Sequence, residues 1–144
     1  MPSRKLSDLV PEMQVKANEF AVAMHDAGIQ FIFTQTKRTV LEQNAYFAQG
    51  RNSLEVVNNM RKAAGLPDIS AKENSRIVTK TIKSRHLTGN AFDIAIVVNG
   101  KIIWNVNLDA DGDGVPEYKE AALIGESVGL RAGFRFGDPP HFEI

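Results

Sequence analysis

The chain has 144 residues, with 17 basic and 17 acidic side chains and no cysteine. This length favours one domain over residues 1–144 with a real hydrophobic core, and the missing cysteines exclude disulfides and thiolate metal sites. The balanced charge argues against nucleic acid as the main partner, and membrane insertion is not expected because no run approaches the ~20 apolar residues of a membrane span.

The N-terminal half is predicted to contain three helices and one short strand. Apolar residues recur at helical spacing in three stretches, and each stretch is followed by a glycine that suits a helix C-terminus. Ser7 is expected to cap the first helix, and Thr39 with Glu42 forms a capping-box pattern at the start of the second. The helices are expected over residues 7–27, 39–50 and 53–64, with a strand over residues 29–34 and a polar loop over residues 65–83.

A β-hairpin is predicted in the middle of the chain. Asn99-Gly100 is a strong signal for a two-residue turn between strands over residues 94–98 and 101–106. Along the strand that precedes this turn, side chains alternate between an apolar face and a face that carries Asp93 between two alanines. A buried carboxylate needs a strong partner because its desolvation is costly, and the small neighbours of Asp93 leave room for one.

A metal ion is a candidate for that partner. Gly89-Asn90 indicates a turn that could fold His86 back beside Asp93, and His141 could join them from a distant strand. Two imidazole nitrogens and one carboxylate oxygen suit Zn²⁺, and three protein ligands leave the fourth position for water. The sequence therefore predicts a metal site that could activate a water molecule.

A second metal element lies at residues 109–120. Aspartates occupy the first, third and fifth places of a twelve-residue loop, Gly114 supplies the sharp turn, and Glu120 can close the shell in bidentate fashion. The pattern predicts an EF-hand-like Ca²⁺ loop, here preceded by a strand rather than a helix. Its expected ligands are Asp109, Asp111, Asp113, Val115, Glu117 and Glu120.

The C-terminal third is expected to connect the calcium loop with His141. A helix is predicted over residues 117–128, and the alternating stretches 134–136 and 141–143 are expected to form short strands. We expect Ca²⁺ to order the loop and this helix, and so to help to set the positions of Asp138 and His141.

The histidine and aspartate pattern resembles a known family. Ser84-x-His86-x-x-Gly89-x-Ala91-x-Asp93 matches in full the Ser-x-His-x-x-Gly-x-Ala-x-Asp signature of the VanY-like zinc peptidases, the D-Ala-D-Ala carboxypeptidase and L-alanyl-D-glutamate peptidase group. Asp138-x-x-His141 resembles the acidic-x-x-His element of that family, with Asp where many members have Glu. The resemblance implies an α+β fold of the DD-peptidase and hedgehog-like type, in which helices pack on a small antiparallel sheet.

The resemblance also implies roles for single residues. Asp138 would be the general base, and Arg38 would polarise the scissile carbonyl. Glu143 is a competing candidate for the base because it also neighbours His141. The ligands of the catalytic zinc would be His86, Asp93 and His141.

Among these peptidases, the chain is most similar to phage endolysins that cut the L-alanyl-D-glutamate bond of bacterial peptidoglycan. It is short and shows no signal peptide, so it would be made in the cytoplasm of the host bacterium and reach the cell wall after release across the membrane. We expect a monomer that is activated by calcium and lyses the host. Two alternatives stay open: a D-Ala-D-Ala dipeptidase or carboxypeptidase with the same zinc site, and a non-catalytic calcium-dependent cell-wall-binding module.

Overall fold

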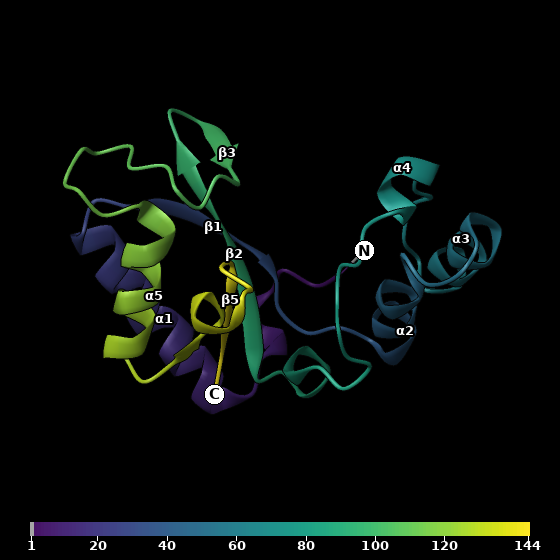
Figure 1. Cartoon of the computed structure of the whole chain (residues 1–144). Coiled ribbons are helices and arrows are strands. Elements are labelled where there is room, and N and C mark those ends of the chain that lie inside the picture. Colours follow the sequence, from purple (N-terminus) through teal and green to yellow (C-terminus); the bar gives the residue numbers. More distant parts are fainter. Residues whose placement is uncertain (1) are drawn as a thin grey trace.

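A computed structural model describes residues 2–144, and its helices and strands form two lobes (Figure 1). The sheet lobe carries α1 and α5 beside the strands, and the helical lobe contains α2, α3 and α4. Among residues 2–144, no helix combines the length and the apolar character that crossing a membrane requires. In chain order the elements are η1 (Leu6–Asp8), α1 (Pro11–Asp26), β1 (Gln30–Gln35), α2 (Val40–Ala48), α3 (Leu54–Ala63), α4 (Ala71–Asn74), η2 (Arg85–Thr88), β2 (Ala91–Val98), β3 (Lys101–Ile103), α5 (Glu117–Ser127), β4 (Arg131–Ala132), η3 (Gly133–Phe136) and β5 (His141–Glu143).

All strand pairs of the sheet are antiparallel. The order is β1-β2-β5-β4, and β3 pairs with the end of β2. Asn99 and Gly100 have φ values of 51° and 76°, the positive values that a type I′ turn requires, so the predicted hairpin is confirmed. β3 ends at Ile103, earlier than expected, because the Asn105 side chain accepts a hydrogen bond from the amide of Asn107 at 3.0 Å and turns the chain.

The core lies between the sheet and helices α1 and α5. The ring of Phe20 packs against the rings of Phe92 and Phe142, with centroid distances of 5.5 and 4.8 Å. Because aromatic side chains bury large apolar areas, this cluster fixes β2 and β5 against α1. The apolar stripe of α1 is buried as the periodicity predicted, at Met13, Ala17, Phe20 and Met24.

The helical lobe is organised by α2. The predicted capping box is confirmed: the amide of Glu42 donates to the Thr39 hydroxyl, and the amide of Thr39 donates to the Glu42 carboxylate at 2.8 Å. On the buried face of α2, the Gln43 side chain donates to the Thr81 carbonyl at 2.8 Å and so holds the long loop. That loop contains α4, a single helical turn at residues 71–74, where the sequence predicted only a polar loop.

The predicted start of the first helix is wrong. The sequence placed its cap at Ser7, but α1 begins at Pro11, and residues 6–8 form the separate 3₁₀ helix η1. Proline has no amide hydrogen and suits the first helical position, and it keeps the residue before it, Val10, extended. The chain therefore cannot continue one helix through both segments.

The predicted strand over residues 134–136 is also wrong. These residues belong to the 3₁₀ helix η3, and the two-residue strand β4 that precedes it was not predicted. The backbone turns at Gly133, whose carbonyl accepts a hydrogen bond from the amide of Asp138 at 2.8 Å. A Cβ on Gly133 would overlap atoms of Asp138 and His141, so this close approach brings the last strand back beside β4.

Candidate functional site

The register of the sheet places the candidate site on the face opposite the core. Asp93 in β2 lies directly across from His141 in β5, and Phe92 lies across from Phe142. Because successive side chains of a strand point to opposite faces, the phenylalanine pair enters the core while Asp93 and His141 share the other face. Glu143 follows His141 by two residues and is therefore on the same face, where it is buried.

His86 reaches this face from the short helix η2. The Ser84 hydroxyl accepts a hydrogen bond from the amide of His86 at 3.2 Å and caps the helix. Gly89 ends it with a φ of 75°, a left-handed conformation that costs glycine little. His86 Nε2 consequently lies 3.1 Å from Asp93 Oδ1, so the structure places the two residues side by side as the turn predicted.

Three hydrogen-bond acceptors converge at the centre of the site. His86 Nδ1 lies 2.6 Å from the carbonyl oxygen of Thr36, and His141 Nε2 lies 2.9 Å from a carboxylate oxygen of Glu143. Because these partners only accept hydrogen bonds, we infer that each outer ring nitrogen carries the proton and each inner nitrogen of a neutral ring carries a lone pair. Both inner nitrogens lie 3.1 Å from Asp93 Oδ1. Two lone pairs and an anionic oxygen repel one another, so the arrangement needs a shared cation.

The donor atoms fit a zinc ion. The ligand atoms of His86, Asp93 and His141 lie within 4.8 Å of one another, and two imidazole nitrogens with a carboxylate oxygen form a donor set that zinc prefers. The Thr36 carbonyl and the Glu143 carboxylate are the kind of outer partner that orients metal-binding histidines. These five residues could therefore hold Zn²⁺ and leave a position for water.

The electrostatics of the site keep Asp93 ionised. Burial alone would raise the pKa of Asp93, but the neighbouring imidazoles of His141 and His86 hold that pKa well below its usual range. Desolvation would lower the pKa of His141, yet the hydrogen bond to Asp93 and the charge of Asp93 outweigh desolvation and raise it. The carboxylate of Asp93 thus favours a positive charge beside it, carried either by a proton on His141 or by a metal ion.

Arg38 is fixed at the junction of the two lobes with its guanidinium beside Asp93. One nitrogen, Nη2, lies 3.3 Å from Asp93 Oδ2. Its Nε donates to Gln35 at 2.6 Å and its Nη1 donates to Gln43 at 3.0 Å. The guanidinium carbon also lies 5.1 Å from the centroid of the Tyr46 ring, within the range of a cation–π interaction. The structure thus brings Arg38 to the edge of the candidate metal site.

Asp138 and Glu143 occupy opposite sides of the His141 ring. Asp138 Oδ2 lies 4.0 Å from the inner nitrogen Nδ1 of His141, and the Asp138 side chain is 56% exposed. Glu143 contacts the outer nitrogen, and its second oxygen pairs with Arg85 Nε at 2.7 Å. A base for a metal-bound water must face the metal, so the geometry favours Asp138. Partial desolvation and the nearby carboxylate of Asp93 raise the pKa of Asp138.

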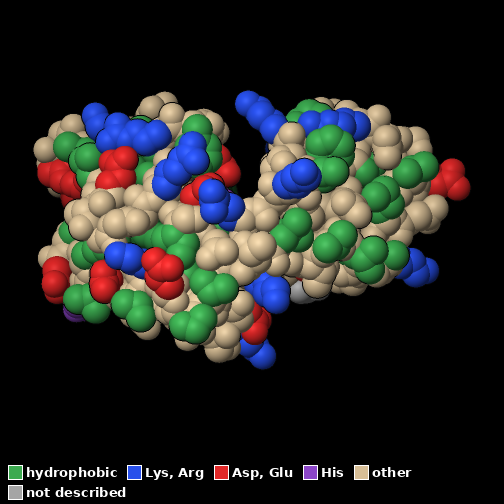
Figure 2. All heavy atoms as spheres, turned by 90° about the horizontal axis from the view of Figure 1, so that it is seen from below, with side chains coloured by type: hydrophobic (Ala, Val, Ile, Leu, Met, Phe, Trp, Pro, Cys, Tyr) green, Lys and Arg blue, Asp and Glu red, His purple; other side chains and the backbone are tan. Residues whose placement is uncertain are grey.

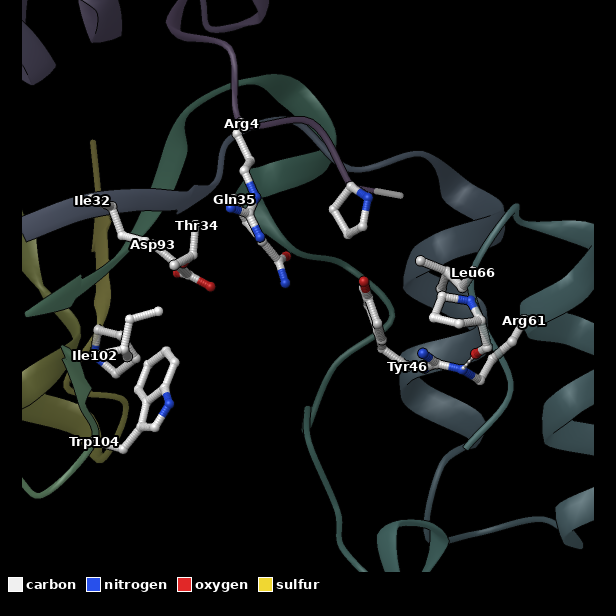
Figure 3. A pocket seen from close by; sticks show the side chains of 13 residues that line it. Arg4, Ile32, Thr34, Gln35, Tyr46, Arg61, Leu66, Asp93, Ile102 and Trp104 are labelled. Carbon is white, nitrogen blue, oxygen red and sulfur yellow. Dashed lines mark hydrogen bonds between the residues drawn. The ribbon is translucent and has the colours of Figure 1, made fainter. Parts of the chain in front are cut away.

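A cleft extends to both sides of Asp93. Its larger part, about 520 Å³, is bordered by Asp138 and His141 and by the basic residues Lys80, Lys83 and Arg85. Its smaller part, about 390 Å³, lies between Trp104 on the sheet lobe and Tyr46 on the helical lobe (Figure 3). Figure 2 shows a notch between the lobes, with Lys and Arg side chains on both of its rims. An extended ligand could therefore lie in the notch and pass Asp93.

The predicted calcium loop lies between β3 and α5 and does not border either part of this cleft. Gly114 has a φ of 89°, as the sharp turn of such a loop requires. Burial, a hydrogen bond with Asp113 and the negative charge of Asp111 together raise the pKa of Glu120 to about 7. The carboxylates form two overlapping groups, Asp109 with Asp111 and Glu117, and Asp111 with Asp113 and Glu120.

Glu117 and Val115, two of the predicted calcium ligands, also make hydrogen bonds within the loop. Glu117 is buried, and its carboxylate accepts hydrogen bonds from the amides of Ala110 and Asp111 at 2.8 and 3.4 Å. The amide of Val115 donates to Asp113 at 2.8 Å. The first residue of α5 thus anchors the start of the loop.

The roles of three residues that orient the site could not be predicted from the sequence. Thr36 contributes only its backbone carbonyl, so its side-chain type gives no indication of that role. Gln35 reaches Arg38 from the point where the β1 register shifts, and strand alternation does not predict such an irregularity. Glu143 was visible as a carboxylate near His141, but the side of the ring that it contacts depends on the three-dimensional structure.

The chain is similar to known cell-wall peptidases. It is 28% identical to the peptidoglycan L-alanyl-D-glutamate endopeptidase CwlK of Bacillus subtilis (strain 168) over 142 residues, which are 96% of this chain and 74% of CwlK. The crystal structure of the Serratia marcescens L-Ala D-Glu endopeptidase ChiX matches with a TM-score of 0.60 and 17% identity, over 100% of this chain and 88% of ChiX. VanYB in complex with D-alanine-D-alanine matches with a TM-score of 0.47 and 15% identity, over 94% and 70% of the two chains. No protein-family model matches the chain.

The resemblance to the L-alanyl-D-glutamate peptidases and the α+β fold, both predicted from the sequence, are confirmed by these findings. The helices and the antiparallel sheet therefore share the fold of ChiX.

We predict that Glu143→Gln weakens zinc binding. The variant loses the charge that accepts the proton of His141 Nε2, and loss of such an outer partner typically costs about 10–100-fold in metal affinity. Competition with a chromophoric chelator would measure the change. Glu19→Gln, which alters an exposed carboxylate on α1, is the matched control and should bind zinc like the parent. Equal affinities for Glu143→Gln and the parent would contradict an orienting role for Glu143.

We also predict that zinc affinity falls as the pH is lowered through the pKa of His141. The proton on Nδ1 must leave before a metal binds there, and the raised pKa of His141 means that this proton competes at higher pH than on an ordinary histidine. Below that pKa, each pH unit should weaken the apparent affinity by about ten-fold for one competing proton. Chelator competition at a series of pH values would show the slope, and an affinity that stays flat down to about pH 6 would contradict it.

Proposed function

We propose that the chain is a zinc-dependent peptidoglycan endopeptidase that hydrolyses the L-alanyl-D-glutamate bond of the cell-wall stem peptide. The main support is the convergence of His86, Asp93 and His141 on a point that needs a cation, next to Asp138 and in an open cleft. The similarity to CwlK, whose name states this activity, supports the choice of bond.

The side chains around the cation would divide the chemistry of amide hydrolysis. When bound by His86, Asp93 and His141, zinc would polarise the scissile carbonyl and lower the pKa of a water molecule. Asp138 would accept the proton of that water and deliver it to the leaving amine. The raised pKa of Asp138 suits both transfers, because a catalytic group works best when its pKa approaches the working pH.

Arg38 would stabilise the negative charge that develops on the carbonyl oxygen. Bonds to Gln35, Gln43 and Asp93 fix its guanidinium. Among residues 2–144, these side-chain bonds engage three of the five N–H donors of the group, so two more could face a substrate. Because the guanidinium is already held in place, it needs little reorganisation when the charge appears.

The basic rim of the larger cleft would bind the acidic part of the substrate. Lys80, Lys83 and Arg85 line the cleft on the side of Asp138. The D-glutamate of the stem peptide is linked through its γ-carboxyl group and keeps a free carboxylate, which such a rim would attract.

Calcium would be a second, structural or activating ion, bound by the loop over residues 109–120. Binding would relieve the repulsion among its carboxylates and order the start of α5. The α5 helix is joined to the site region at two points, because the Tyr118 hydroxyl donates to the Ile103 carbonyl at 2.6 Å and Glu126 pairs with Arg135 of η3. Calcium would thereby steady the segment that leads to Asp138.

We propose a phage-type role for this activity. A monomeric endolysin made in the host cytoplasm would reach the peptidoglycan once the membrane is breached, and cutting the stem peptides would lyse the host.

The bond that is cut tests the proposal. Purified peptidoglycan incubated with the zinc- and calcium-loaded protein should release stems with a new D-glutamate amino terminus, which mass spectrometry detects. Release of terminal D-alanine alone would indicate a carboxypeptidase with the same zinc site. No new peptide ends under any metal condition would favour a non-catalytic wall-binding module.

In the same assay, Asp138→Asn should lower kcat by about 10²–10⁴-fold, the usual contribution of a general acid–base group. The zinc content should stay unchanged because Asp138 lies 4.0 Å from His141 and outside the converging ligand set. Glu19→Gln, an exposed position on α1, serves as the surface control. Cleavage by Asp138→Asn at the parental rate would show that another group is the base.

We predict that calcium raises the thermal stability of the protein. An ion that binds only the folded state adds about 2.7 kcal/mol at a hundred times its Kd. Glu120→Gln should lose most of this gain because it removes a carboxylate of the loop, whereas Glu126→Gln on the same helix should keep it. Thermal unfolding with calcium and with a calcium chelator would measure the effect. If chelation left both stability and activity unchanged, the calcium site would be refuted.

A further inference from the structure

We propose that Trp104 forms a subsite for the sugar to which the stem peptide is attached, on the acyl side of the scissile bond. This subsite rests on the proposed function and adds to it the direction in which the substrate lies in the cleft.

Trp104 is placed as a binding residue rather than as a core residue. It is the one tryptophan of the chain, and 60% of it is exposed. It follows β3 and lies beside Ile102 at the smaller part of the cleft, across from Tyr46 (Figure 3). A large exposed aromatic group on a concave surface is typical of a ligand site. The flat indole face offers apolar contact while its N–H can meet a polar group, which suits a sugar ring with a C–H face and a hydroxyl rim.

The position of Asp138 sets the direction of the substrate. Asp138 borders the larger part of the cleft and does not border the smaller one. A group that passes its proton to the leaving amine must lie on the side of that amine, which belongs to D-glutamate. The D-glutamate half therefore lies in the larger part, where Lys80 and Lys83 line the cleft and would attract its free carboxylate. L-Alanine and the sugar attached to it must then lie on the other side of Asp93, beside Trp104.

The smaller part of the cleft has the shape and lining for this occupant. Its volume of about 390 Å³ is in the range of small-molecule sites, and Asp93 borders both this part and the larger one. The half-exposed side chain of Ile102 extends the apolar wall around Trp104. On the opposite wall, the Nε of Arg61 donates a hydrogen bond to the Pro67 carbonyl at 2.6 Å and so stabilises that wall. The exposed Arg4 of the N-terminal segment also lines this part of the cleft and can bind polar substituents of the sugar.

Tryptophan fluorescence tests the subsite directly, because emission excited at wavelengths that tyrosine does not absorb comes from Trp104 alone. The zinc-loaded Asp138→Asn variant would be titrated with N-acetylmuramyl-L-alanyl-D-glutamate and with N-acetyl-L-alanyl-D-glutamate, which lacks the sugar. The sugar-bearing ligand should shift the emission to shorter wavelength in a saturable way, and the sugar-free ligand should not. Calorimetry should show that the sugar-bearing ligand binds about ten-fold more tightly, as expected for one well-packed aromatic contact.

Kinetic measurements on variants that keep Asp138 provide a second test. The quantity to compare is the ratio of kcat/KM for the sugar-bearing substrate to kcat/KM for the sugar-free substrate. Trp104→Ala should reduce this ratio by about ten-fold, and Trp104→Phe should restore most of it because an aromatic face remains. Leu123→Ala removes an exposed apolar side chain on α5 and should keep the parental ratio.

Equal emission changes with the two ligands, or an unchanged ratio in Trp104→Ala, would overturn the subsite. A parent protein that cleaves neither substrate would overturn the proposed function alone, because the fluorescence titration still decides whether the sugar binds at Trp104.

Discussion

One carboxylate oxygen, Oδ1 of Asp93, is the point on which the site depends. Two imidazoles approach it at 3.1 Å with the nitrogens that bear their lone pairs, because their outer nitrogens are engaged by Thr36 and Glu143. An ionised carboxylate that is largely removed from water is stable only when its charge is compensated. The turn before β2, the pairing of β2 with β5 and the backbone carbonyl of Thr36 just after β1 together provide that compensation. The same arrangement creates a site for a divalent cation.

The second oxygen of Asp93 joins the site to the helical lobe. It pairs with Arg38, which stands immediately before the capped start of α2 and is also held by Gln35 and Gln43. The two lobes therefore meet through charge-assisted hydrogen bonds at the metal site, and the cleft opens to either side of that contact. This contact fixes the separation of the cleft walls. The side chain of Asp93 therefore influences both the width of the substrate cleft and the arrangement of the metal ligands.

The parts of the site that local sequence pattern determines could be predicted, and the parts that depend on tertiary register could not. Asp93 between two alanines in an apolar strand, with His86 before a Gly-Asn turn, is a local pattern, and the structure brings these residues together. The capping box of α2 and the Asn99-Gly100 hairpin are local in the same sense. By contrast, the contact of Glu143 with the outer nitrogen of His141 follows from the pairing of β5 with β2 and from the rotamer of one ring. The strand expected at residues 134–136 failed for a similar reason, because three alternating residues cannot outweigh a backbone turn that closes at Gly133.

The position of the acidic loop explains how an ion outside the cleft could act on the site. Glu117 anchors the loop and is also the first residue of α5. An ion that orders the loop would therefore also order the start of the helix. The next residue, the buried Tyr118, accepts a hydrogen bond from the amide of Ile96 in β2 and donates one to the carbonyl of Ile103 in β3. At its far end, α5 holds η3 through the pair of Glu126 with Arg135, and η3 leads directly to Asp138. The helix thus contacts both the strand that carries Asp93 and the segment that carries the candidate base. An ion that rigidifies α5 would therefore limit the motion of Asp138 relative to Asp93 and the metal ligands. General-base catalysis is sensitive to this motion because Asp138 must stay in hydrogen-bond contact with the water that it deprotonates.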